Sequence, residues 1–132
     1  MDWLNWQWQL KNCYRTLADL DQALILTGDE RETLLTSWLP LCITPYYLDL
    51  VCMSPALRKC VIPTSNEFTV GEGEGDDPLN ETDHSPVPGL IHRYPDRVAL
   101  LATTTCANYC RYCTRSRLAG RGEPANLEDA LR

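Results

Sequence analysis

The sequence predicts an α/β protein, in which a helical N-terminal region (1–62) and a connecting segment (63–92) precede one strand–loop–helix unit (93–132). Apolar residues at helical spacing and Ser/Thr–Pro pairs indicate the helices. A mostly apolar, β-capable run at 97–104 indicates the strand. Because a single βα unit cannot form a sheet, we expect the rest of an α/β domain to lie outside these residues.

Length and composition fit one soluble globular domain. The chain has 132 residues, 44% of them apolar, and a formal net charge of −6. No window reaches the ~20 uninterrupted apolar residues that a membrane span needs. The N-terminus lacks a basic stretch followed by an apolar one, so no secretion signal is evident. We therefore expect a cytoplasmic protein that does not enter a membrane.

The first predicted helices lie between residues 2 and 38. In 2–26 three leucines recur at helical spacing, and Gly28 is suited to end the helix. These leucines are Leu17, Leu20 and Leu24. Asp29 can then cap a second helix over 30–38, which Pro40 stops.

Two Ser/Thr–Pro pairs predict two further helices. Thr44 and Ser54 each place a capping oxygen immediately before a proline, and proline is favoured in the first helical turn. We expect these helices over 46–52 and 56–61.

The connecting segment 63–92 holds four prolines, four glycines and an acidic run at 72–77. This composition leaves little material for regular structure. Segments of this length are usually functional or linking.

The strand predicted at 97–104 is apolar on both faces, as strands of parallel sheets are. A cysteine-containing loop follows it, and a helical pattern begins at 126–132. In such a unit the site lies at the carboxyl end of the strand.

Charge is divided unevenly along the chain. Residues 1–92 carry five basic and fourteen acidic side chains, whereas 93–132 carry seven arginines and four acids. Arginine suits bidentate binding of carboxylate or phosphate, so a site for small anions near the cysteines is one interpretation. A solvated basic face is an equal alternative. The acidic isoelectric point and the lack of a long basic stripe argue against a nucleic-acid partner.

Three of the seven cysteines, Cys106, Cys110 and Cys113, lie within eight residues in the pattern C-x3-C-x2-C. Three thiolates can hold three corners of a 4Fe–4S cluster and leave one iron open to chelate a substrate or cofactor. Zinc is the rival, and a structural zinc would need His84 or His92 as its fourth ligand. The other four cysteines have apolar neighbours and are expected to act as small buried hydrophobic residues.

With Tyr112 before its last cysteine, this motif resembles the signature of the radical S-adenosylmethionine superfamily. Other stretches resemble the lysine 2,3-aminomutase family in order and spacing over nearly the whole chain. They are Asn5-Trp6-Gln7-Trp8-Gln9-Leu10-Lys11-Asn12, Ile43-Thr44-Pro45-Tyr46-Tyr47, Asp77-Pro78-Leu79, Ser85-Pro86-Val87-Pro88-Gly89, the adjoining Leu90-Ile91-His92-Arg93-Tyr94-Pro95-Asp96-Arg97, Cys110-Arg111-Tyr112-Cys113-Thr114-Arg115 and Arg117-Leu118-Ala119-Gly120.

The resemblance implies an isomerase that moves an amino group between adjacent carbons of an amino acid. L-lysine is the favoured substrate, with glutamate or a protein lysine as alternatives. The implied cofactors are a 4Fe–4S cluster, S-adenosylmethionine and pyridoxal 5′-phosphate. A radical S-adenosylmethionine (β/α) barrel, of which only the beginning lies in this chain, is the implied fold.

The resemblance also implies roles for individual residues. The cluster ligands would be Cys106, Cys110 and Cys113, with Tyr112 beside S-adenosylmethionine. Arg93, Tyr94 and Arg97 would hold pyridoxal phosphate, and Arg115 would pair with the substrate carboxylate. Ser116 departs from the family, whose members commonly have arginine there.

Pyridoxal phosphate needs a lysine for its resting Schiff base. The chain has only Lys11 and Lys59, both in the helical region. We therefore expect the cofactor lysine to lie downstream and no catalytic residue to lie within this chain. The chain is then expected to be the N-terminal piece of a longer enzyme and to be inactive alone. The full-length enzyme is expected to be a homo-oligomer that takes electrons from a flavodoxin or ferredoxin. The alternative is a stand-alone iron–sulfur or zinc-binding protein.

Overall fold

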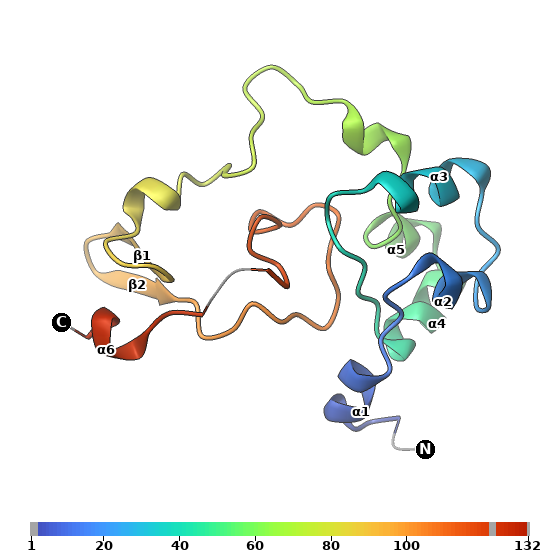
Figure 1. The fold of residues 1–132 in the computed structure, drawn as a ribbon, viewed down its shortest axis with the longest axis horizontal. Coiled ribbons are helices and arrows are strands. Elements are labelled where there is room, and N and C mark those ends of the chain that lie inside the picture. The colour runs from blue at the N-terminus through green and yellow to red at the C-terminus, as the bar shows by residue number, and fades with distance from the viewer. Residues whose placement is uncertain (1–2, 122–123, 132) are drawn as a thin grey trace.

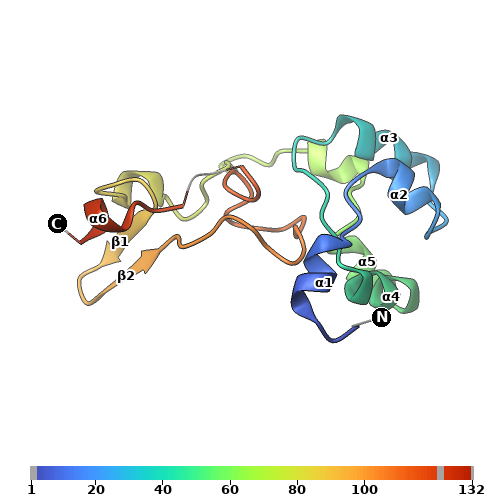
Figure 2. The same ribbon diagram turned by 60° about the horizontal axis from the view of Figure 1, so that its bottom comes forward.

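The computed structural model describes residues 3–121 and 124–131. Five helices form one end of the molecule, a two-stranded sheet and a short helix form the other, and two long segments connect them (Figures 1 and 2). The α-helices are α1 (Trp6–Lys11), α2 (Leu17–Asp21), α3 (Gly28–Thr36), α4 (Pro45–Met53), α5 (Pro55–Lys59) and α6 (Leu127–Ala130). Two 3-10 helices, η1 (Ser65–Phe68) and η2 (Thr82–His84), precede the strands β1 (Leu90–Tyr94) and β2 (Arg97–Leu100).

The main hydrophobic core lies in the helical end. Its buried side chains come from α2, α4 and the segments that follow α2, α3 and α5. They are Leu20, Leu26, Ile43, Leu48, Val51, Val61 and Ile62. Removing these side chains from water supplies the main driving force for folding this region.

The N-terminal helices are shorter than the leucine pattern predicts. An antiparallel bridge between Tyr14 and Ile43 separates α1 from α2, with backbone hydrogen bonds of 2.8 and 3.1 Å. The prediction that Gly28 ends a helix is wrong, because Gly28 is the first residue of α3. Thr27, rather than Asp29, caps that helix in a reciprocal capping box with Glu30.

The two Ser/Thr–Pro pairs behave as predicted. The Thr44 hydroxyl accepts a hydrogen bond from the Tyr47 amide at the start of α4. The Ser54 hydroxyl accepts one from the Leu57 amide at the start of α5. In both helices proline occupies the first turn, where its missing N–H costs nothing. Local capping chemistry therefore determines these helix starts.

An ion pair ties α3 to α5. The Arg58 guanidinium donates to the Glu30 carboxylate at 2.7 Å, and its Nη2 also donates to the Ile25 carbonyl. The Arg58 hydrogen bond holds the pKa of Glu30 below its ordinary value. The pair thus fixes the helices around one side of the core.

The prediction of a strand buried on both faces of a parallel sheet is wrong. Strand β2 pairs antiparallel with β1, and all its residues are exposed. Pro95 and Asp96 form the tight turn, with Tyr94 opposite Arg97. Two strands joined by so short a turn can only run antiparallel, since a parallel pair needs a long crossover. The mixture of helix and strand agrees with the prediction, but no barrel closes within the described residues.

The connecting segment 63–92 contains η1, η2 and most of β1, so its described residues are more ordered than the composition suggests. The predicted boundaries at 62 and 92 stay a prediction. The predicted C-terminal helix exists as α6, capped by the Asn126 side chain, while Arg132 lies outside the described residues. In the described part of the chain, every helix is too short or too polar to cross a membrane.

Candidate functional site

The cysteine loop, residues 106–113, lies against the helical region (Figure 1). The Tyr109 amide donates to the Cys42 carbonyl at 2.9 Å, and the Arg111 amide donates to the Cys60 carbonyl at 2.8 Å. Asn108 accepts hydrogen bonds from both the amide and the hydroxyl of Thr44. Residues between the cysteines therefore anchor the loop.

Arg111, between the last two cysteines, makes the most extensive of these contacts. Its side chain is only 5% exposed and forms a two-pronged ion pair with Glu67 of η1. The same guanidinium donates to the Ser37 hydroxyl at 2.6 Å and to the Leu39 carbonyl at 3.3 Å. Burying a guanidinium is tolerable only with such complete pairing.

Tyr109 packs in a second buried cluster with Leu39, Cys42 and Ala119. Gly120 lies directly over its ring, with a positive φ of 67°, and a Cβ there would lie 2.3 Å from the Tyr109 hydroxyl oxygen. The chain can therefore fold back over Tyr109 only because residue 120 is glycine.

The three motif cysteines remain accessible beside these anchors. Cys106 is exposed, whereas Cys110 and Cys113 are partly buried, and the Cys113 amide donates to the Cys110 carbonyl in a tight turn. Burial raises the pKa of the Cys110 thiol, and the nearby thiols of Cys113 and Cys106 raise it further.

The donor set on the loop can be compared with what a 4Fe–4S cluster requires. Three soft thiols on one anchored loop suit iron, and the loop backbone is held by residues other than the ligands. Among the described residues, no three His, Cys, Asp or Glu side chains converge closely enough to hold a single metal ion. His84 donates through Nδ1 to the Asn80 carbonyl at 2.7 Å, and His92 lies exposed on β1. The residue types on the loop therefore suit an iron–sulfur cluster, whereas the described side chains do not converge into a metal site.

Tyr112 is exposed, and the neighbouring Cys110 and Cys60 thiols raise the pKa of its hydroxyl. Together with Cys113 it lines a cavity of about 820 Å³. Glu67 and the 73–76 part of the acidic run line the same cavity. The cysteine loop and the acidic run therefore border one cavity.

A second cavity, of about 230 Å³, brings together four predicted site residues from two segments. Arg93, Tyr94 and Arg97 come from the hairpin, and Arg115 comes from beyond the cysteine loop. The Arg97 guanidinium lies 5.0 Å from the Tyr94 ring centroid, and Arg93 donates to the Leu79 carbonyl at 2.7 Å. Three guanidinium groups therefore line one cavity, and guanidinium groups suit the binding of carboxylate or phosphate.

Two acids of the connecting segment form ion pairs with arginines that follow the cysteine loop. The sequence suggests only that these acids belong to a connecting segment. Glu81 accepts from Arg115 at 2.7 Å and from Arg117 at 3.2 Å, and Asp77 pairs with Arg117 at 3.1 Å. The solvated-face alternative is thus wrong for Arg111 and Arg117, whose side chains are mostly buried. In the sequence, the net negative charge of residues 1–92 and the net positive charge of 93–132 could have indicated ion pairs between the two parts.

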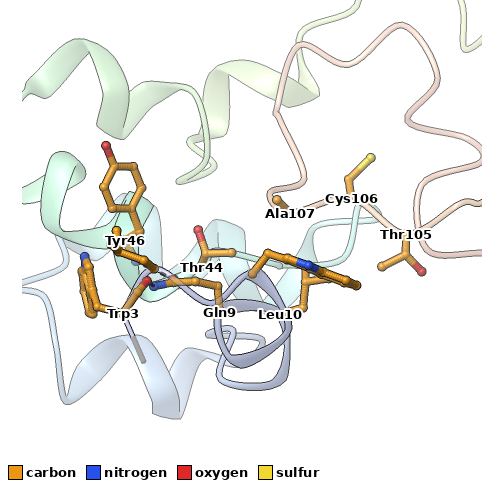
Figure 3. A pocket seen from close by; sticks show the side chains of 10 residues that line it. Trp3, Gln9, Leu10, Thr44, Tyr46, Thr105, Cys106 and Ala107 are labelled. Carbon is orange, nitrogen blue, oxygen red and sulfur yellow. Dashed lines mark hydrogen bonds between the residues drawn. The ribbon is translucent and has the colours of Figure 1, made fainter. Parts of the chain in front are cut away.

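The N-terminal aromatic residues form a third pocket, of about 400 Å³, beside Cys106. Trp3 stacks near Trp8 and Tyr46, with ring centroids 6.1 and 6.4 Å apart. Figure 3 shows Trp3 and Tyr46 at one side of the pocket, and Cys106 and Ala107 at the other. Gln9 lies between them, accepting from the Tyr46 amide and donating to the Trp3 carbonyl.

The remaining cysteines differ in their environment. Cys42 is buried, and burial raises the pKa of its thiol to about 12, so it stays protonated as a core residue. Cys13 and Cys60 are partly buried. The expectation of burial is wrong for Cys52, which α4 presents to solvent.

No protein-family model matches the chain. Curated relatives match nearly all of it. It is 46% identical to the L-lysine 2,3-aminomutase of Bacillus subtilis over 97% of this chain and 29% of that protein. It is 44% identical to the L-lysine 2,3-aminomutase of Clostridium subterminale over 92% of this chain and 30% of that protein. The glutamate 2,3-aminomutase of Clostridioides difficile is 34% identical over 91% of this chain and 29% of that protein.

The relatives therefore define the class: the chain is homologous to amino acid 2,3-aminomutases, which are isomerases. Within that class, the similarity to the lysine 2,3-aminomutase family, indicated by the motifs, is confirmed. The chain spans about 30% of the length of the curated relatives named L-lysine 2,3-aminomutase in Bacillus subtilis and Clostridium subterminale.

Proposed function

We propose that the complete product of this gene is a radical S-adenosylmethionine, pyridoxal phosphate-dependent 2,3-aminomutase that converts L-lysine to L-β-lysine. The observation that carries the proposal is the cavity that gathers Arg93, Tyr94 and Arg97 with Arg115, which follows the anchored three-cysteine loop by two residues. The similarity to named lysine 2,3-aminomutases supports the same reaction.

In this proposal Cys106, Cys110 and Cys113 ligate the cluster, and Tyr112 lies beside S-adenosylmethionine. When bound, the cluster with S-adenosylmethionine would supply radical chemistry for removing a substrate hydrogen, and pyridoxal phosphate would supply the chemistry for moving the amino group. The guanidinium groups of Arg93 and Arg97 bind the phosphate dianion, with Tyr94 against the cofactor ring. Arg115 binds the substrate carboxylate and so orients the carbon from which hydrogen is removed.

The chain's own lysines do not suit the pyridoxal Schiff base. Lys11 ends α1 and Lys59 ends α5, both are exposed, and neither lines the arginine cavity. Residues 1–132 alone are therefore proposed to hold a cluster but to lack activity. We further infer a cytoplasmic, homo-oligomeric enzyme that receives electrons from a flavodoxin or ferredoxin.

Activity of the complete gene product tests the proposal. The protein is reconstituted anaerobically with iron, sulfide and pyridoxal phosphate, then given S-adenosylmethionine, a one-electron reductant and either L-lysine or L-glutamate. We expect β-lysine, detected by chromatography and mass spectrometry, and a slower or absent reaction of glutamate. Preferred conversion of glutamate would move the assignment to the second relative's reaction. No conversion of either amino acid would contradict the aminomutase function.

A further inference from the structure

Glu81 is a buried carboxylate to which neither the cysteine motif nor the family resemblance gives a role. Its side chain is only 4% exposed. Two guanidinium groups, those of Arg115 and Arg117, cover its oxygens. A carboxylate removed from water must be paired in this way or lose its charge.

Arg115 uses only one edge of its guanidinium to bind Glu81. Its Nε donates to the two carboxylate oxygens at 3.0 and 3.1 Å, and its Nη2 donates to Oε1 at 2.7 Å. A guanidinium carries five N–H donors, so three remain, two of them on Nη1. Within the part of the chain that the structure describes, Nη1 donates to no protein group. The end edge of the guanidinium is therefore available to a second carboxylate.

That second carboxylate has a place to bind. Arg115 is 45% exposed in its side chain and lines the 230 Å³ cavity with Glu81, Arg93 and Arg97. A guanidinium can bind one carboxylate along its Nε–Nη2 edge and another along its Nη1–Nη2 edge, each through parallel N–H donors.

Glu81 is itself fixed by groups other than Arg115. Its amide donates to Asp77 at 3.0 Å, and its carbonyl accepts from the Ser85 hydroxyl at 2.8 Å. Arg117 holds Oε2 at 3.2 Å and also pairs with Asp77. The 77–85 turn thus sets the position of the Glu81 carboxylate, and that carboxylate in turn sets the plane of the Arg115 guanidinium.

We propose that Glu81 is a positioning residue, which turns the free edge of Arg115 toward the cavity so that it binds the carboxylate of the amino acid substrate. This inference rests on the proposed function, because it concerns recognition of that substrate. Glu81 does not touch the substrate itself. It favours binding of a carboxylate because it holds the Arg115 side chain in place beforehand. Less conformational entropy is then lost when the substrate binds.

Binding without turnover tests the proposal. With the complete gene product loaded with pyridoxal phosphate, equilibrium dialysis without S-adenosylmethionine compares L-lysine with L-lysinamide, which lacks the carboxylate. We expect the wild type to bind lysine more tightly. Glu81→Gln is expected to weaken lysine binding about tenfold, because Arg115 loses its fixed orientation, and to leave lysinamide binding unchanged. Asp83→Asn, in the same turn and without a side-chain contact among the described residues, is the matched control.

Glu81→Asp is measured together with Glu81→Gln. The aspartate keeps the negative charge, but its carboxylate is one methylene farther from Arg115. We expect the same selective loss of lysine binding, with the negative charge beside Arg115 and Arg117 retained. Equal weakening of lysine and lysinamide in both variants would overturn the positioning role and indicate a structural one. Unchanged lysine binding in a folded variant would also overturn it and leave the proposed function standing. A wild type that does not distinguish lysine from lysinamide would overturn both.

Discussion

The arginines around the cysteine motif differ sharply in burial, and that difference separates arginines that anchor the loop from arginines that remain open to solvent. Arg111 is 5% exposed and paired with Glu67, whereas Arg97 is 69% exposed and, among the described residues, forms its ion pair with the neighbouring Asp96. A buried ion pair that loses one partner leaves an uncompensated charge in the interior. An exposed pair contributes little, because water solvates both partners when they separate.

Arg111→Ala is therefore expected to lower the free energy of unfolding by about 3 kcal/mol or more, because it strands Glu67 and breaks the link between the cysteine loop and η1. Arg97→Ala is expected to change it by less than about 0.5 kcal/mol. Urea denaturation followed by tryptophan fluorescence measures both. Similar losses in the two variants would contradict the anchoring role of Arg111.

The residues that could be predicted from the sequence are those with local signals. The cysteine spacing and the arginines after it stand out in the sequence, and the structure collects Arg93, Tyr94, Arg97 and Arg115 around one cavity. Glu67 and Glu81 could not be picked out in the same way. Their partners lie 44 and 34 residues away. The sequence around one acid in a Pro/Gly-rich segment that holds many acids does not indicate which distant arginine it pairs with.

At the scale of elements, the two caps that precede a proline could be predicted from the sequence, whereas the cap of α3 and the pairing of the strands could not. Thr44 and Ser54 act on the amides of the next turn, so a short window of sequence contains the whole interaction. The direction of β2 depends instead on the turn at Pro95 and Asp96 and on what covers its faces. An apolar run alone does not distinguish a parallel strand from one arm of a hairpin.

Hydrogen bonds within the turn 77–84 lower the pKa of the Asp77 carboxyl. The Thr82 hydroxyl and amide, the Glu81 amide and Arg117 lower the pKa of Asp77 to about 2. A carboxyl group whose pKa is lowered by folding stabilises the protein above its unfolded pKa. That contribution is lost as the pH falls from about 4 to about 2, when the native carboxylate becomes protonated.

Asp77→Asn is expected to reduce stability at neutral pH and to flatten the loss of stability between about pH 4 and about pH 2. Urea midpoints measured across this range check the expectation. Asp76→Asn removes the adjacent exposed carboxylate, which makes no side-chain contact in the described residues, and should follow the wild type. A pH dependence of Asp77→Asn identical to the wild type would disprove the assignment.

At the scale of the whole molecule, the cysteine loop lies between two structural parts. It is hydrogen-bonded to the helical region, and the residues after it reach the turn at 77–84 through Arg115 and Arg117 (Figures 1 and 2). The acidic connecting segment supplies the partners for both contacts, through Glu67 and Glu81. The charge division along the sequence thus becomes a set of ion pairs that hold the site together.

Anaerobic reconstitution with iron and sulfide, followed by EPR spectroscopy with and without S-adenosylmethionine, tests the central claim most directly. We expect a brown protein whose reduced-cluster signal changes when S-adenosylmethionine is added. Cys110→Ala should abolish the cluster, because it removes one of three ligands, whereas Cys52→Ala, exposed on α4, should leave it intact. A colourless protein that holds one zinc tightly, or equal losses in both variants, would contradict the assignment of the cysteine loop.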